Sequence, residues 1–314
     1  MPFDLERLSV RARLFLRARA RIVQLIREWF QDKGFLEVET PCLCRSPGFE
    51  THIDAFEVSG GLAPLFLATS PEFFMKRLIS AGFERIYQIS KVFRRNEAGE
   101  HHNPEFTMLE WYRKGATYQD MMADCEDLLS EVSLRFSKTE EARDLGIQVL
   151  LKKPFARRKF SQTFEDCGVS EALKLPAEQR LQVFIDKVEP TIGKDAPEFV
   201  FDYPTDMASL AKIRKGKEEI AERFELYASG LELANGFSEI IDSEEFMQRY
   251  REFSNQRAAM GLLPYNADEH FVRMLKDGLL PPCAGVAMGI DRVVMLLCKA
   301  KSIKEVIAFP FDCI

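Results

Sequence analysis

The sequence predicts an α+β fold in which an antiparallel β-sheet is flanked by helices. Three observations lead to this class. Strand-like segments with alternating apolar and polar residues follow one another around short polar loops, which is typical of antiparallel pairs. Segments with helical spacing of apolar residues occur near both ends of the chain and between strands. The segments do not alternate as β-α-β units, which argues against a parallel sheet.

In the first part of the chain, a helix is expected at residues 9–33, where apolar side chains recur at helical spacing. The segment FLEVETP at 35–41 alternates and ends in proline, so it predicts a strand. Another strand should end at Thr69. The next helix should then start with Ser70 as its N-cap and Pro71 as its first helical residue.

Two strands, at 84–95 and 104–115, enclose the polar loop NEAGEHHN and should pair antiparallel. On the second of them, Phe106, Met108 and Glu110 would share one face. The remaining predictions are listed in chain order: a helix at 117–137; a charged insertion with helical segments at about 140–200; a strand at 198–204; a hairpin at 223–240 turning at Ser229-Gly230; helices at 243–260 and 267–277; and a strand at 285–288 entering a helix near 289.

Composition narrows the possible functions. The 314 residues carry a net charge of −6, with 46% hydrophobic residues, so one large domain over 1–314 with an ample core is expected. The acidic balance weakens the case for nucleic-acid binding. Seven scattered cysteines, an odd number, indicate reduced thiols in a cytosolic protein. No apolar run approaches the ~20 residues that cross a membrane, so no membrane partner is expected.

The hairpin carries three glutamates spaced by seven, Glu225, Glu232 and Glu239. A Ser-Gly turn would place Tyr227 opposite Glu232, with Glu225 and Glu232 diagonal on one face. Two such carboxylates suit Mg²⁺ held together with substrate phosphates. The alternative is that these are exposed glutamates on an edge hairpin.

Simple alternation would turn Glu232 and Glu239 to opposite faces. The same register would put Glu225 opposite Ala234. We therefore predict a β-bulge at Asn235-Gly236 that returns Glu239 to the first face.

The segment FRRNEAGEHHNPEFTMLEWY is the second constellation. Arg94 and Arg95 end one strand and could grip a phosphate. Phe106, on the returning strand, suits a flat base, and Glu110 and Tyr112 could hold an ammonium group. Ordinary surface charge on a hairpin is the alternative.

Four motifs in order resemble the catalytic core of class II aminoacyl-tRNA synthetases of the lysyl type: GFLEVETP at 34–41, FRRNE…HNPEFTMLEWY at 93–112, LELANGFSE at 231–239 and GVAMGIDR at 285–292. No segment before the first helix is long enough for an N-terminal anticodon-binding domain. The chain therefore resembles most closely the truncated paralogues of lysyl-tRNA synthetase that attach (R)-β-lysine to elongation factor P.

This resemblance implies a cytoplasmic, homodimeric ligase that uses ATP and Mg²⁺. It would activate (R)-β-lysine or lysine as an adenylate. It would then transfer the acyl group to a lysine ε-amino group on translation elongation factor P. The first motif's proline, Pro41, would lie at the dimer interface, and tRNA is not expected as a partner.

The resemblance also implies residue roles. Arg94 and Arg292 would be catalytic, near the α- and γ-phosphates. ATP would contact Arg94, Asn96, Glu97, His102, Asn103, Phe106, Glu232, Leu233, Gly289 and Arg292. The amino acid would contact Ser70, Glu72, Glu110, Tyr112, Asn235, Glu239 and Ala287. Mg²⁺ would be held by Glu225 and Glu232.

Three features of this pattern carry their own expectations. The family glutamate that reads the adenine amino group is displaced by one place here, because Asn96 stands at that place and Glu97 follows. Either the loop shifts by one residue, or a backbone carbonyl reads adenine. Asp291 would cap the last helix or orient Arg292. Ala287 stands where lysyl-tRNA synthetases usually have glycine, and its methyl group would narrow the pocket near the substrate's α-position.

Three alternatives remain open. The first is a stand-alone lysyl-tRNA synthetase-like enzyme that charges tRNA, against which the lost domain and acidic charge argue. The second is another amide-forming class II paralogue, although the glutamate-rich pocket fits a diamino substrate better than aspartate. The third is a catalytically inactive binding module, against which the complete set of charged residues argues.

Overall fold

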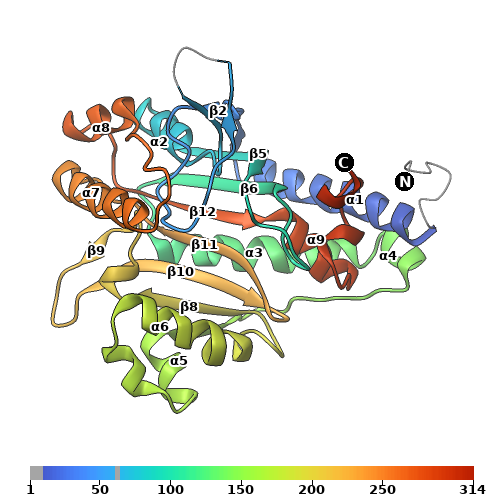
Figure 1. The fold of residues 1–314 in the computed structure, drawn as a ribbon. Helices are drawn as coiled ribbons and strands as arrows, with labels where there is room; N and C mark the ends of the chain where they lie inside the picture. The colour runs from blue at the N-terminus through green and yellow to red at the C-terminus, as the bar shows by residue number, and fades with distance from the viewer. Residues whose placement is uncertain (1–9, 61–63) are drawn as a thin grey trace.

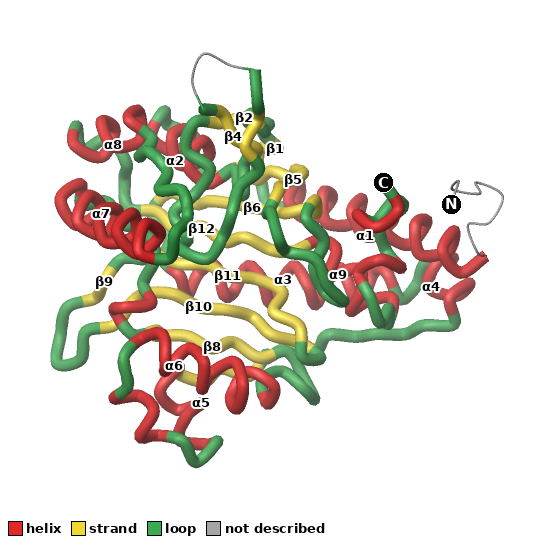
Figure 2. The backbone as a smooth tube through the Cα atoms, viewed as in Figure 1, coloured by secondary structure: helices red, strands yellow, loops and turns green. Residues whose placement is uncertain are grey.

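The computed structural model describes residues 10–60 and 64–314. Its centre is a nine-stranded sheet surrounded by helices (Figures 1 and 2). All neighbouring strands are antiparallel except the two outermost pairs, β1–β5 and β7–β8. The predicted α+β class is thereby confirmed. In spatial order the strands are β1 (Leu36–Glu37), β5 (Arg85–Phe93), β6 (Glu105–Lys114), β12 (Cys283–Gly289), β11 (Leu231–Ser238), β10 (Ile220–Ala228), β8 (Glu198–Tyr203) and β7 (Ala156–Lys159), with β9 (Ile213–Arg214) beside β10.

Helices pack on both sides of this sheet. The helices α1 (Val10–Asp32), α3 (Tyr118–Phe136) and α9 (Ile290–Cys298) share one hydrophobic core with it. A second core joins α2 (Glu72–Ser80), α7 (Ser243–Ala259) and α8 (Glu269–Lys276), which gather at the left of Figure 1. A small sheet of β2 (Leu43–Cys44), β4 (Leu65–Leu67) and β3 (Glu57–Val58) lies to the right of α2 in Figures 1 and 2.

Alternation along β6 assigns each side chain to a face. Trp111 lies in the hydrophobic core beneath α1. Phe30 of α1 contacts the Trp111 ring edge-on, with 5.5 Å between the ring centroids, and the same Phe30 ring stacks on Tyr87 at 4.3 Å. Glu110 and Tyr112 therefore point to the other face, as the sequence pattern predicts. The aromatic core thus fixes the strand that carries the candidate site.

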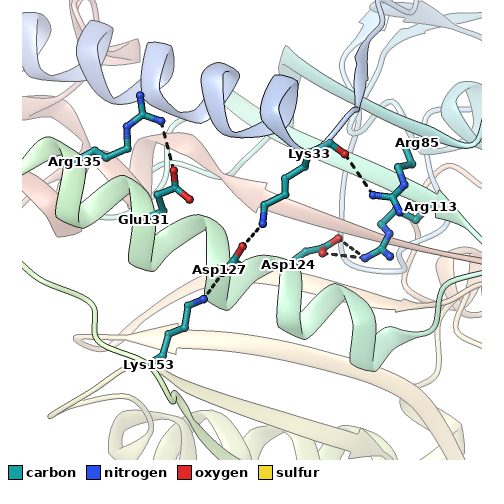
Figure 3. Close-up of polar contacts among 8 residues, drawn as sticks. All are labelled: Lys33, Arg85, Arg113, Asp124, Asp127, Glu131, Arg135 and Lys153. Carbon is teal, nitrogen blue, oxygen red and sulfur yellow. Dashed lines mark hydrogen bonds and ion pairs between the residues drawn. The ribbon is translucent and has the colours of Figure 1, made fainter.

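Ion pairs fasten α3 to its neighbours (Figure 3). Asp127 of α3 lies between Lys33, whose Nζ is 2.6 Å away, and Lys153. Asp124 accepts from Arg113 of β6 at 2.9 Å. Each such partly exposed pair adds at most about 1 kcal/mol, so their main effect is to fix the orientation of α3 beneath the sheet.

Two boundaries differ from the predictions. The strand expected at 35–41 pairs only over Leu36–Glu37, and Val38 adds one bond to the Tyr87 carbonyl at 2.9 Å. It ends before Pro41, which has no backbone N–H to donate. Ser9, the first residue of the predicted N-terminal helix, lies outside the described residues.

The helix α2 starts at Glu72, one residue later than predicted, because Pro71 takes the cap position. Ser70 Oγ still accepts a hydrogen bond from the backbone N–H of Glu72 at 3.3 Å. The predicted side chain is therefore used, but from one place further outside the helix.

Residues 140–200 contain α4 (Glu140–Leu145), α5 (Phe160–Asp166) and α6 (Ala177–Val183). The last two lie below the β8 edge of the sheet in Figure 1 and build a third core around Phe160. The strand β7 was not predicted, because its sequence, ARRK, lacks apolar alternation. Within the described ranges, no helix is both long and apolar enough to cross a membrane.

Candidate active site

A cavity of about 540 Å³ opens on the sheet face that carries Glu110 and Tyr112. It collects sixteen of the eighteen predicted site residues, namely Ser70, Glu72, Arg94, Glu97, His102, Asn103, Phe106, Glu110, Tyr112, Glu225, Glu232, Leu233, Asn235, Ala287, Gly289 and Arg292. Asn96 and Glu239 do not line it. A larger groove of about 1520 Å³ adjoins the cavity and shares Arg223 with it, but contains no predicted site residue.

The hairpin β10–β11 supplies the carboxylates, and its turn has Ser229 and Gly230 at positive φ, as the sequence predicts. Tyr227 lies opposite Glu232, also as predicted. The bulge, however, is at Leu233 rather than at Asn235-Gly236.

This shift changes the partner of Glu225, which faces Asn235 and not Ala234. A Cβ on Gly236 would come within 2.7 Å of the Phe224 ring, so that glycine serves close packing and not the bulge. The consequence of the bulge is nevertheless the predicted one, because Glu232 and Glu239 return to the same face.

Glu225 is held by three donors: the Tyr203 hydroxyl at 2.7 Å, the Tyr227 hydroxyl, and Arg223 Nη2 at 2.6 Å. Burial, and then the neighbouring charge of Glu225, raise the pKa of Glu232 to about 7. Water reaching the 36% exposed Glu232 side chain moderates this rise.

Within the described ranges, no cluster of three or more metal-binding side chains is present. Two carboxylates that repel each other fit a Mg²⁺ ion that takes its other ligands from phosphates and water. Glu225 and Glu232 therefore fit the predicted metal role.

The nucleotide end of the cavity, as we name the part around Arg94, His102, Glu232 and Arg292, is rich in cationic groups. Arg292 donates to the Glu232 carbonyl at 2.7 Å, and its Nη2 lies 2.7 Å from Nε2 of His102. Burial, and then Arg292, lower the pKa of His102. A guanidinium only donates, so the neutral imidazole accepts through Nε2.

Arg94 lies over the ring of Phe106, with its guanidinium carbon 5.2 Å from the ring centroid. Its buried Nε makes no hydrogen bond to any residue in the described ranges. A buried donor without a partner is costly, which fits an incoming anionic group such as a phosphate.

Glu97 lies 3.7 Å from Arg94 Nη1 and lines the cavity, whereas Asn96 turns away at φ 70° and donates to Asp54 at 3.4 Å. Of the two candidates for reading adenine, only Glu97 faces the cavity. Asn103 lines the cavity, but both polar atoms of its side chain already have partners within the protein. Its Nδ2 donates to the Glu105 carbonyl at 2.6 Å, and its Oδ1 accepts from the Phe311 N–H.

Asp291 does not orient Arg292 and does not cap α9, contrary to the prediction. Its carboxylate accepts from Arg19 of α1 at 2.5 Å and from the backbone N–H of Thr107 at 2.7 Å. The cap position of α9 is Gly289 and carries no side-chain hydrogen bond. Asp291 therefore ties the start of α9 to β6 and α1.

The amino-acid end, the part of the cavity around Glu72, Glu110 and Tyr112, is largely buried and lined by carboxyl groups. The Tyr112 hydroxyl donates to Glu110 Oε2 at 3.0 Å. Burial, and then the charge of Glu72, raise the pKa of Glu110 to about 8. A Cβ on Gly285 would lie 2.2 Å from the Tyr112 ring, so the glycine is what admits that ring.

Glu239 lies behind this end, 2% exposed, and pairs with Lys76 of α2. Lys76 Nζ is 2.5 Å from Glu239 Oε2 and 2.5 Å from Glu72 Oε1. Burial raises the pKa of Glu239 to about 8, against the opposing effect of Lys76. Both oxygens of Glu239 are buried, and neither accepts a hydrogen bond from the described residues.

Ala287 lies between these groups on β12. Its register partners are Glu110 of β6 and Asn235 of β11. The side-chain amide oxygen of Asn235, Oδ1, accepts a hydrogen bond from Arg223 Nε at 3.2 Å. The methyl group of Ala287 thus lies on the cavity wall between the carboxylate and the amide, where the sequence analysis expects it to limit space.

Comparison with known proteins agrees with this geometry. A family model described as tRNA synthetases class II (D, K and N) matches residues 3–312. The chain belongs to the class II tRNA synthetase family. Among its class II relatives, proteins named elongation factor P–(R)-β-lysine ligase resemble it over nearly their full length. Those of Hamiltonella defensa and Yersinia pestis are 40% identical, and that of Vibrio atlanticus 42%. The alignments cover 94% of this chain and 94–95% of the relatives.

Within this class II architecture, sequence reasoning missed several residues of the site. Lys76 follows Glu72 by four positions on a helix, a spacing that predicts a side-chain pair. Tyr227 lies two residues after Glu225 on β10, so both side chains share one face, and the hydrogen bond between them could have been inferred. Tyr203 and Arg19 come from distant segments, and no sequence signal in a single chain places them.

Proposed function

We propose that this protein is an AMP-forming ligase that activates (R)-β-lysine, or lysine, with ATP and transfers it to a lysine side chain of elongation factor P. One observation supports this most directly: a single cavity joins an arginine-rich end to a carboxylate-rich end. The first suits a nucleotide and the second a diamino acid. The names of the similar ligases supply the acceptor.

In the first step, a carboxylate oxygen of the amino acid attacks the α-phosphorus of ATP. The bond from that phosphorus to the bridging oxygen breaks, and pyrophosphate leaves. Arg94 lies where its guanidinium could stabilise the charge that develops on the α-phosphate. Arg292 would hold the outer phosphates, and bound Mg²⁺ would draw charge from them at Glu225 and Glu232.

In the second step, the unprotonated ε-amino nitrogen of the acceptor lysine attacks the carbonyl carbon of the adenylate. AMP leaves, and the nitrogen loses one proton to form the amide. No side chain needs to act as a covalent nucleophile, because the cavity contributes through positioning and charge. Glu110 and Tyr112 would hold the distal ammonium of the substrate, and Glu72 with Ser70 the amino group nearer the carboxylate.

Mass spectrometry of elongation factor P after incubation with this protein, ATP and each lysine isomer tests the proposal. We expect the mass of one lysyl group to be added with (R)-β-lysine. No added mass with that isomer would contradict the proposal. A parallel assay with tRNA should show no charging, and charged tRNA would favour a stand-alone synthetase instead.

We also propose a cytoplasmic homodimer in which all 314 residues form one catalytic domain. The support is the first-motif segment that ends at Pro41. The mass of the particle in solution, measured by light scattering, tests the dimer: a monomer at assay concentration would contradict it.

A further inference from the structure

The proposed reaction gives no role to Lys76, a lysine of α2 in an unusual environment. It is a lysine with 0% exposure, and its ammonium lies between two carboxylates from different elements. Glu72 belongs to the same helix, and Glu239 follows β11. The rings of Phe237 and Phe271 approach the ammonium at 5.3 and 5.9 Å. A charge so fully removed from water requires close partners to remain ionised.

We propose that Lys76 is a positioning residue for the amino-acid substrate: its ammonium joins Glu72 to the buried Glu239 and holds Glu72 in place at the cavity for the substrate's amino group. This inference rests on the proposed function for its substrate, a diamino acid. Lys76 itself would not touch the substrate, since none of its surface is exposed.

A count of charges supports this role. Two carboxylates, those of Glu72 and Glu110, line the amino-acid end, and a third, that of Glu239, lies behind them. A diamino acid brings two ammonium groups, and its own carboxylate would point toward Arg94. Two cations leave one buried carboxylate unbalanced, and Lys76 supplies the third positive charge.

Lys76 occupies Oε1 of Glu72, and the Glu72 side chain lines the cavity, so it can still meet the substrate. Lys76 Nζ also lies 2.5 Å from Oε2 of Glu239. Both oxygens of Glu239 are buried, and neither accepts a hydrogen bond from the described part of the chain. Titratable groups that act on this cluster include Glu110 and Tyr112 of β6 and Cys283 of β12, and the ring of Phe271 approaches it from α8.

Loss of Lys76 should therefore change binding in a pH-dependent way. Burial already raises the pKa of Glu239, and Lys76 opposes that rise. Without the ammonium, the pKa of Glu239 would rise further above its value of about 8. A smaller fraction of this carboxylate would then be ionised at each pH of the assay, and the protonated form attracts an ammonium group poorly.

The experiment compares wild type with Lys76→Met and Lys76→Gln in ATP–pyrophosphate exchange driven by (R)-β-lysine and by lysine, between pH 6.5 and 9. We expect KM at pH 7 to rise at least tenfold, with kcat within threefold of wild type. The ratio of variant to wild-type KM should shrink as the pH rises. A ratio that is the same at every pH, an unchanged KM, or a loss confined to kcat would overturn the proposal.

Two further variants complete the test. Lys91→Met removes an exposed lysine from the same sheet and should match wild type at every pH. Lys76→Met combined with Glu239→Gln removes both buried charges, so it should fold even where Lys76→Met alone does not. The KM of this double variant should not follow the titration of Glu239, and a KM that still falls as the pH rises would exclude Glu239 as the titrating group.

Exchange is measured without elongation factor P. A failure of acyl transfer in the presence of normal exchange would therefore contradict the proposed function and leave the role of Lys76 intact.

Discussion

The two ends of the cavity hold their charges in opposite ways. At the nucleotide end, Arg94 and Arg292 are 22% and 21% exposed, and the carboxylate of Glu232 is open to water. At the amino-acid end, Glu110 and Glu239 are each 2% exposed, and the balancing cation is sealed behind them.

This difference in exposure indicates how each end of the cavity would recognise its ligand. An open, cationic end can follow a mobile phosphate chain with arginines that reorient at little cost. At a buried end lined by carboxyl groups, each attraction to a ligand cation is stronger because the dielectric is low. The ligand must then match these carboxylates in the number and position of its ammonium groups. We therefore expect changes at the first end to slow chemistry and changes at the second to alter which amino acid binds.

The largest expected effect is at the nucleotide end. Arg94→Ala should lower kcat for pyrophosphate exchange by about 10²–10³-fold, because it removes a donor aimed at developing charge. The affinity for lysine, measured by calorimetry, should stay within threefold of wild type. Arg95→Ala, an exposed neighbour that does not line the cavity, is the control. Equal losses in both variants would remove the distinction between the two ends.

Next in size is a change in amino-acid choice. Ala287→Gly removes a methyl group from the wall beside Glu110 and should improve kcat/KM for α-lysine by about 10–100-fold, equivalent to about 1–3 kcal/mol. Exchange assays with both lysine isomers measure this. An unchanged isomer preference would show that the methyl group only packs.

The fit of Tyr112 is a third test. Gly285→Ala would place a Cβ where the Tyr112 ring now lies, so we expect a loss of about 1–3 kcal/mol in stability from overpacking. KM for lysine should rise with it, since the ring carries a donor to Glu110. Thermal unfolding and exchange report the two effects. Gly216→Ala, whose Cβ would meet only an atom 3.8 Å away, should be near neutral.

The smallest effect is on the stability of the ligand-free protein. The pKa of Glu110 is raised to about 8 from 4.5, so between these values the folded state binds more protons than the unfolded state. Stability should therefore be highest near pH 5 and fall until about pH 8. Glu110→Gln removes this group and should stabilise the protein by about 1–2 kcal/mol at pH 8.

Melting temperatures between pH 5 and 8.5 measure this, with Glu105→Gln, an exposed glutamate on the same strand, as the control. The melting temperature of wild type should fall more steeply with pH than that of Glu110→Gln. Identical slopes would mean that Glu110 is charged in the empty site.

Most of the fold follows from the sequence because its strands obey simple periodicities. The hairpin turn and the face of Glu110 were predictable from alternation and from the Ser229-Gly230 pair. The position of the bulge was not, since it is a matter of the register between β10 and β11, which the alternation along one strand does not determine.

The site divides in the same way. Motif residues that follow one another along a strand reach the cavity as predicted. Asp291 did not, because its partner Arg19 comes from a helix 272 positions away in the chain. Lys76 was overlooked because its importance lies in Glu239, which a sequence pattern cannot place beside it.

The bulge at Leu233 has one more consequence, for insertions and deletions. Deleting Leu233 would eliminate the two-for-one pairing and leave a regular strand. Glu232 and Glu239 would then be six positions apart, so alternation would keep both on one face and activity should largely survive. Deleting one residue between Asn235 and Ser238 would instead turn them to opposite faces and should abolish activity.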